Sequence, residues 1–147
     1  MTPNDADIEI RLLSHPRNLC VVRGAVRAAF ESAGFGQAAC AQVVLAVDEA
    51  LANVIRHGYE GREDGPIWVR LSACVENERS GLQVVIEDEG QQIDPEKICG
   101  RDLSDVRPGG LGVHIIRQVM DDVVYSKRPE AGMRLALTKW ADATAAA

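Results

Sequence analysis

The stretch Glu49-Ala-Leu-Ala-Asn53 lies within a run from residue 37 to residue 55 or 57 whose apolar side chains recur at the spacing of one helical face. Glu49, Asn53 and His57 are four residues apart, so they stack on one side of the predicted helix. A polar stripe beside an apolar one predicts a helix that packs on the core with one side. Its other side lines a cleft or meets solvent.

The rest of the chain predicts short elements on both sides of this helix. In chain order we expect a strand at 8–13, a helix at 16–33, the helix above, strands at 67–75 and 82–87 around a turn at 77–81, a helix from 109 to about 120, and strands at 123–127 and 133–140. This order predicts an α+β fold, a two-layer sandwich whose mainly antiparallel sheet is covered by helices on one face. Residues 89–108 lack periodicity, and such long loops are commonly functional lids.

Length and composition indicate one domain spanning residues 1–147, with a frayed tail at 141–147. The formal net charge of −6 argues against direct nucleic-acid binding, which needs a basic face. We find no secretory signal, no apolar stretch approaching a membrane span, and no C-x-x-C pair among the four cysteines. The expected location is therefore the cytoplasm, with reduced thiols and no membrane contact.

Glu49 and Asn53 offer two different oxygen chemistries one helical turn apart. The Glu49 carboxylate could accept a proton from an attacking hydroxyl or water. The Asn53 amide supplies a neutral oxygen of the kind that Mg²⁺ prefers. Taken singly, a solvated helix glutamate and a satisfied helix asparagine fit the same positions.

Asp88 and Gly90 come at the end of a predicted strand. An ionised carboxylate there can accept a hydrogen bond from an exocyclic amine such as that of adenine. Gly90 lacks the Cβ that would keep a flat base away from the backbone. An ordinary turn after the strand explains the same residues.

Gly109, Gly110 and Gly112 surround the start of a predicted helix. Free N–H groups and the helix dipole favour an anion there, and missing side chains allow phosphate to approach. Arg107 and Arg56 could add positive charge, although an ordinary surface role suits each equally well. The glycines could instead form a hinge without a ligand. Together with the preceding motifs they suggest a magnesium-nucleotide site.

Four motifs in this order resemble the successive boxes of the ATPase superfamily shared by gyrase, histidine kinases, heat-shock chaperones and mismatch-repair proteins: Glu49-Ala-Leu-Ala-Asn53-Val-Ile-Arg-His-Gly-Tyr59, Asp88-Glu-Gly90, Gly109-Gly-Leu-Gly112 and Leu135-Ala-Leu-Thr138-Lys-Trp140. Within that superfamily the chain is most similar to the bacterial anti-sigma-factor serine kinases. The resemblance extends from residue 8 to residue 140.

The resemblance implies a protein that binds ATP and Mg²⁺, holds a sigma factor inactive and phosphorylates a serine on an anti-anti-sigma partner. A homodimer is left open. The residues that it assigns are Glu49 as the catalytic carboxylate, Asn53 as the Mg²⁺ ligand, Asp88 as the adenine acceptor, Gly90 under the base, Gly109, Gly110 and Gly112 in the phosphate loop, and Thr138 supporting adenine through Asp88. Arg56, His57 and Arg107 are further expected nucleotide contacts.

Two functional classes remain open from the sequence. In the first, Glu49 activates a partner's serine and the protein is a kinase. In the second, ATP only gates the affinity for a protein partner, with little or no phosphoryl transfer. One departure from the superfamily pattern concerns both classes: Gln92 stands where many members continue D-x-G-x-G with glycine, which leaves open how tightly this turn grips the base.

Overall fold

The computed structural model describes residues 6–98 and 111–142, and the elements in this part follow the expected order. The strands and longer helices are β1 (Ile8–Leu13), α1 (Leu19–Ser32), α2 (Gln37–Asn53), β2 (Pro66–Glu76), β3 (Arg79–Asp88), α3 (Leu111–Val119), β4 (Asp122–Lys127) and β5 (Met133–Trp140). Three short helical turns complete them: η1 (Pro16–Asn18), η2 (Val54–Gly58) and η3 (Pro95–Lys97).

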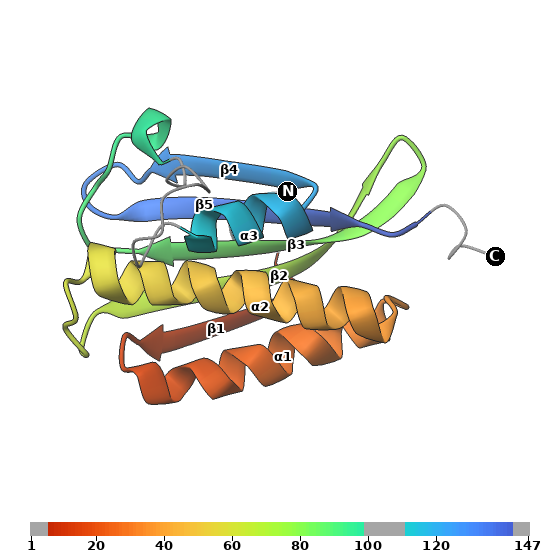
Figure 1. Cartoon of the computed structure of the whole chain (residues 1–147), viewed down its shortest axis with the longest axis horizontal. Coiled ribbons are helices and arrows are strands. Elements are labelled where there is room, and N and C mark those ends of the chain that lie inside the picture. The colour runs from red at the N-terminus through yellow and green to blue at the C-terminus, as the bar shows by residue number, and fades with distance from the viewer. Residues whose placement is uncertain (1–5, 99–110, 143–147) are drawn as a thin grey trace.

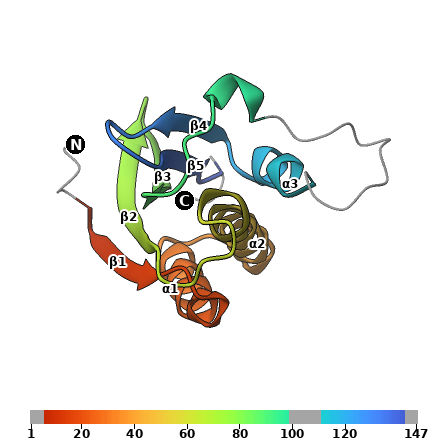
Figure 2. The same cartoon turned by 90° about the vertical axis from the view of Figure 1, so that its left-hand side faces the viewer.

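Within the described residues the sheet has five strands in the order β1-β2-β3-β5-β4, and every neighbouring pair is antiparallel. Helices α1, α2 and α3 all lie on one face of this sheet, as the two views show (Figures 1 and 2). The predicted α+β sandwich is therefore confirmed.

The core lies between the sheet and the helices. It is formed by the inward-facing residues of the strands and of the helices. Alternate residues of β2 and β3 point to the helical layer, and residues of α1 and α2 at three- and four-residue intervals point back. The most deeply buried of these are Val22, Val26, Phe30, Val43, Val47, Leu51, Ile67, Val69, Val84 and Ile86. Because α2 buries only part of its circumference, the side that carries Glu49 and Asn53 remains available for a site.

The hairpin between β2 and β3 corrects one prediction. The turn contains only Asn77 and Glu78, and both have positive φ, 51° and 65°, as a two-residue hairpin with the right-handed twist of strands requires. Gly81, expected in the turn, lies within β3. A Cβ there would come 2.5 Å from the backbone oxygen of Lys139 in β5, so glycine permits close strand packing.

The end of α2 departs from regular helix. At η2 the chain widens into a π turn, in which the Tyr59 amide donates to the Val54 carbonyl. Residues 37–58 together are long and apolar enough to cross a membrane by length and composition, contrary to our expectation from the sequence. Core helices satisfy the same criterion, and here Val47 and Leu51 of this helix are buried in the core.

Two predicted segments are described only in part. The proposed lid, residues 89–108, is described as far as residue 98 and contains η3, while residues 99–108 lie outside the described residues. Residues 143–147 of the predicted frayed tail also lie outside them.

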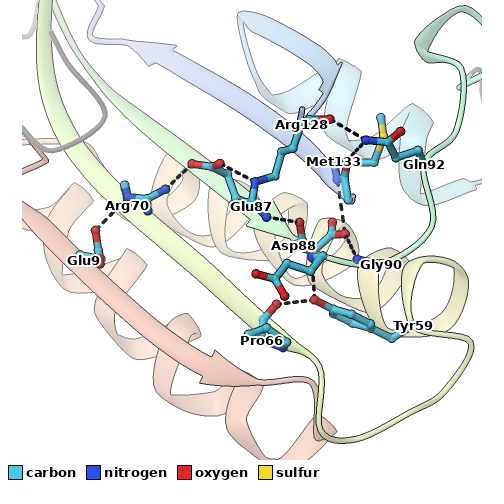
Figure 3. Close-up of polar contacts among 12 residues, drawn as sticks. Glu9, Tyr59, Pro66, Arg70, Glu87, Asp88, Gly90, Gln92, Arg128 and Met133 are labelled. Atoms are coloured by element: carbon cyan, nitrogen blue, oxygen red, sulfur yellow. Dashed lines mark hydrogen bonds and ion pairs between the residues drawn. The ribbon is translucent and has the colours of Figure 1, made fainter. Parts of the chain in front are cut away.

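Tyr59 ties the end of the helical layer to the sheet. Its side chain is 2% exposed, and its hydroxyl donates to the Pro66 carbonyl and accepts from the Glu89 amide at 2.7 Å. Figure 3 shows this hydroxyl between the start of β2 and the end of β3. Burial raises the pKa of Tyr59, so the hydroxyl keeps the proton that it donates.

Replacing Tyr59 by Phe should lower the free energy of unfolding by about 1–3 kcal/mol, because a part-buried amide and carbonyl lose their partner. Urea denaturation measures the change. Tyr125→Phe is the matched control, since its hydroxyl makes no hydrogen bond with the described residues, and it should change the midpoint little. Equal effects of the two substitutions would contradict the bridging role of Tyr59.

Candidate functional site

A cavity of about 240 Å³ opens between the C-terminal half of α2, η2, the sheet and residues 91–98. Its walls are mainly apolar and are formed by Ala50, Val54, Ile86, Ile93, Ile98, Val113, Tyr125, Met133 and Leu135. The polar side chains at its surface include Asn53, His57, Asp88 and Gln91. An apolar cavity with a few placed polar groups is the usual form of a small-molecule site.

Asp88 is the buried acceptor of this cavity. It is the last residue of β3 and is 3% exposed. Its Oδ1 accepts from the amides of Gly90, at 2.8 Å, and Met133, at 3.4 Å, whereas Oδ2 accepts no hydrogen bond from the described residues. Burial raises the pKa of Asp88, and these two amides and the charge of Arg128 oppose that rise.

Residues of the turn between β4 and β5 contact the backbone of Asp88. The Arg128 guanidinium donates to the backbone oxygen of Asp88 at 2.7 Å and pairs with Glu87 at 3.0 Å (Figure 3). Gly132 has a φ of +84°, and a Cβ on it would overlap the Asp88 carbonyl. Only glycine fits here, because both the backbone conformation and the close approach exclude a side chain.

Glu49 and Asn53 lie together under the first turn of α3. A Cβ added to Gly112 would come 2.7 Å from Glu49 Oε2 and 3.5 Å from Asn53 Nδ2. Both side chains are half-buried, and they come from α2 as the four-residue spacing predicted. The structure therefore brings Glu49, Asn53 and Gly112 to one place at the edge of the cavity.

Arg56 and His57 belong to η2, which forms one side of the cavity. The Arg56 guanidinium donates to Asn53 Oδ1 at 3.4 Å and is exposed, and the exposed His57 lines the cavity. The remaining expected contacts, Arg107, Gly109 and Gly110, lie outside the described residues.

Gly90 has a packing role that the sequence analysis did not predict, and its place under a base stays a prediction. It is not among the described residues that line the cavity, and a Cβ on it would overlap the carbonyl of Gly58. The next residue, Gln91, donates its amide to that same carbonyl at 2.9 Å. Glycine at position 90 thus allows the D-x-G turn to pack on the end of η2.

Thr138 does not support Asp88. It lies on the face of the sheet away from the helices, opposite Gln83 and Asp122, and accepts from Gln83 Nε2 at 3.5 Å. Met133, five residues earlier in β5, is the residue that contacts Asp88. Five residues along a strand amount to about 16 Å and an opposite side-chain direction, which explains the error.

The sequence analysis also missed the residues that form the wall opposite α2. Met133, Tyr125 and Ile93 line the cavity, and Gly132 packs against the backbone of Asp88. The only local signal was Gly132, which ends a turn between two predicted strands. Which of its neighbours face the cavity depends on how β5 pairs with β3.

Comparison with known proteins agrees with this geometry. Residues 12–139 match the family described as the histidine kinase-like ATPase domain. The chain belongs to this family. Membership in an ATPase family implies the use of ATP, which the apolar cavity and its buried acceptor fit.

Curated relatives carry a more specific name. The chain is 30% identical over 140 residues to the serine-protein kinase RsbW of Listeria innocua, covering 90% of this chain and 86% of that protein. It is 25% identical over 147 residues to RsbW of Bacillus subtilis, covering 93% and 88%. Both relatives are thus named as serine-protein kinases, and each match covers most of the two chains.

Among solved structures, the histidine kinase domain of the Erythrobacter litoralis blue-light-activated histidine kinase superposes with a TM-score of 0.48 at 21% identity. The match covers 82% of this chain and 60% of that one. The chain therefore spans less than two thirds of that structure.

Asp88→Asn should change how stability depends on pH. Because burial raises the folded-state pKa of Asp88, its contribution to stability is fully present below the ordinary value of 3.8 and is lost as pH rises through the folded-state pKa. The amide variant does not lose it. We expect the unfolding free energy of the variant, relative to the wild type, to rise as pH increases from below 3.8 through the raised folded-state pKa of Asp88. A difference that does not vary with pH in urea titrations would contradict the role of burial.

Proposed function

We propose that this chain is an ATP-dependent anti-sigma regulatory factor that binds a sigma factor and phosphorylates a serine on an anti-anti-sigma partner. One observation carries the proposal: Glu49 and Asn53 lie together under the first turn of α3, beside a cavity whose buried acceptor is Asp88. The names of the curated relatives support serine as the acceptor residue.

The cavity suits an adenine base. Apolar side chains from the helix and from the sheet, among them Val54 and Met133, form two walls between which a flat ring can lie. Oδ2 of Asp88, which accepts no hydrogen bond from the described residues, is placed to accept from an exocyclic amine, and Oδ1 is held by two backbone amides. Guanine offers a carbonyl at the corresponding position, so a buried carboxylate favours adenine.

The polar edge of the cavity suits the phosphates and the reacting hydroxyl. Asn53 would hold Mg²⁺ through its amide oxygen, and bound Mg²⁺ supplies charge neutralisation for the phosphates. Glu49, one turn earlier on α2, would accept the proton of the partner's serine hydroxyl. Phosphoryl transfer needs little more from the protein than such positioning and electrostatic stabilisation.

The alternative is an ATP-gated protein-binding switch with little or no kinase activity. One contact favours it: Arg56 donates to Asn53 Oδ1, the oxygen that the metal needs. That contact is long and exposed, so a bound metal can displace it. In either function the protein acts on cytoplasmic partners, and a homodimer stays a prediction.

Glu49→Gln should abolish phosphorylation of an anti-anti-sigma domain while ATP still binds, because the amide cannot accept the serine proton. The measurement is transfer of labelled phosphate from ATP with Mg²⁺, with mass spectrometry to locate the modified serine. The control is Asp48→Asn, the neighbouring carboxylate, which pairs with Arg23 of α1 and should leave transfer intact.

Labelling that survives Glu49→Gln would remove Glu49 from the catalytic role. If the wild type labels no partner but ATP changes its affinity for one, the switch is the correct function.

Asp88→Asn should weaken ATP binding about ten- to hundredfold, the usual worth of a hydrogen bond to a charged group, and should reduce the preference for ATP over GTP. Isothermal titration with each nucleotide measures both effects. Unchanged ATP affinity would contradict the assignment of Asp88 as the adenine acceptor.

A further inference from the structure

Gln92 connects the segment after Asp88 to the turn between β4 and β5. Its side-chain Nε2 donates to the backbone oxygens of Arg128, at 2.6 Å, and Gly132, at 3.2 Å. Figure 3 shows the amide pointing at this turn. Gln92 is the residue that departs from the D-x-G-x-G pattern, and a glycine at this position could make neither contact.

The turn that receives these two bonds is itself held firmly. Arg128 is bonded to Glu87 and to the Asp88 carbonyl, and its guanidinium lies 5.1 Å from the centre of the Trp68 ring. Gly132 packs directly on the Asp88 backbone. The two carbonyls are therefore fixed in position relative to the cavity, and a donor bonded to both becomes fixed as well.

The residues on either side of Gln92 form part of the cavity wall. Gln91 and Ile93 line the cavity, as does Ile98 at the end of the described segment. The Ile93 amide also lies 3.5 Å from the sulfur of Met133, another lining residue. Gln92 itself is not among the described lining residues. Its hydrogen bonds therefore hold the lining segment to the β4–β5 turn without contact with the cavity.

We propose that Gln92 is a positioning residue that fastens the wall segment, residues 91–98, to the β4–β5 turn and thereby slows the release of bound nucleotide. The inference rests on the proposed nucleotide site and identifies a residue that controls it without touching the ligand. Its physical basis is that an amide nitrogen offers two N–H donors to two carbonyl acceptors.

Substitutions separate this donor role from simple packing. Gln92→Ala removes both bonds. Gln92→Glu keeps the shape but turns a carboxylate toward two carbonyls, so at neutral pH it should be the more damaging change. At about pH 5 a larger fraction of the introduced carboxyl is protonated and can donate one bond, so its defect should shrink.

The release of ATP carrying a fluorescent label on the ribose, followed by stopped-flow displacement with excess ATP, tests the proposal. Gln92→Ala should release it about two- to tenfold faster than the wild type, the usual worth of a hydrogen bond. Gln92→Glu should be faster still at neutral pH and should approach Gln92→Ala at acid pH. Gln83→Ala, which removes a glutamine amide on the open face of the sheet, is the control and should release at the wild-type rate.

A second measurement needs no nucleotide. Hydrogen exchange at the Ile93 amide in the free protein should be faster in Gln92→Ala than in the wild type, and unchanged exchange would overturn the proposal. Equal release rates for wild type and Gln92→Glu would also overturn it, because shape alone would then suffice. If the wild type binds no labelled nucleotide while Ile93 exchange still responds, the proposed function fails and the fastening role stands.

Discussion

The site depends on keeping the Asp88 carboxylate inside an apolar cavity. Transferring a charge from water is costly unless hydrogen bonds replace the lost hydration. Here the amides of Gly90 and Met133 replace part of it, and both reach Oδ1 because the backbone approaches the carboxylate closely. Glycine is required at 132, where a Cβ would overlap the Asp88 carbonyl, and at 90, where it would overlap the Gly58 carbonyl. The burial of Asp88 therefore goes together with close backbone packing at these two glycines.

The two layers of the fold contribute different chemistry to the cavity. The sheet supplies Asp88 and the apolar wall around Met133, which suit recognition of a base. Helix α2 supplies Glu49 and Asn53 at the opposite end, where α3 begins. Because the core residues of α2 face the sheet, its polar stripe is held at a fixed distance from the end of β3. The packing of the hydrophobic core thus sets the distance between Asp88 at one end of the cavity and Glu49 and Asn53 at the other.

A chain of charged residues on the open face of the sheet supports the same place. Glu9 pairs with Arg70, Arg70 with Glu87, and Glu87 with Arg128 (Figure 3). Isolated surface pairs contribute little to stability. This series of ion pairs is partly buried, and its last member, Arg128, donates to the Asp88 carbonyl. Its main effect is therefore to orient the β4–β5 turn. The edge strand β1 is thereby linked to the cavity on the other side of the sheet.

The sequence by itself determined the order of the elements, the α+β class and the common helical face of Glu49 and Asn53, because periodicity and four-residue spacing are local properties of the chain. Only the tertiary structure decided that Met133 rather than Thr138 meets Asp88, and that Gly90 packs on Gly58. Side-chain direction in a strand reverses at every residue, so the residues that face a cavity depend on register with neighbouring strands. Close backbone contacts likewise join segments far apart in the chain, and no local pattern of residues encodes them.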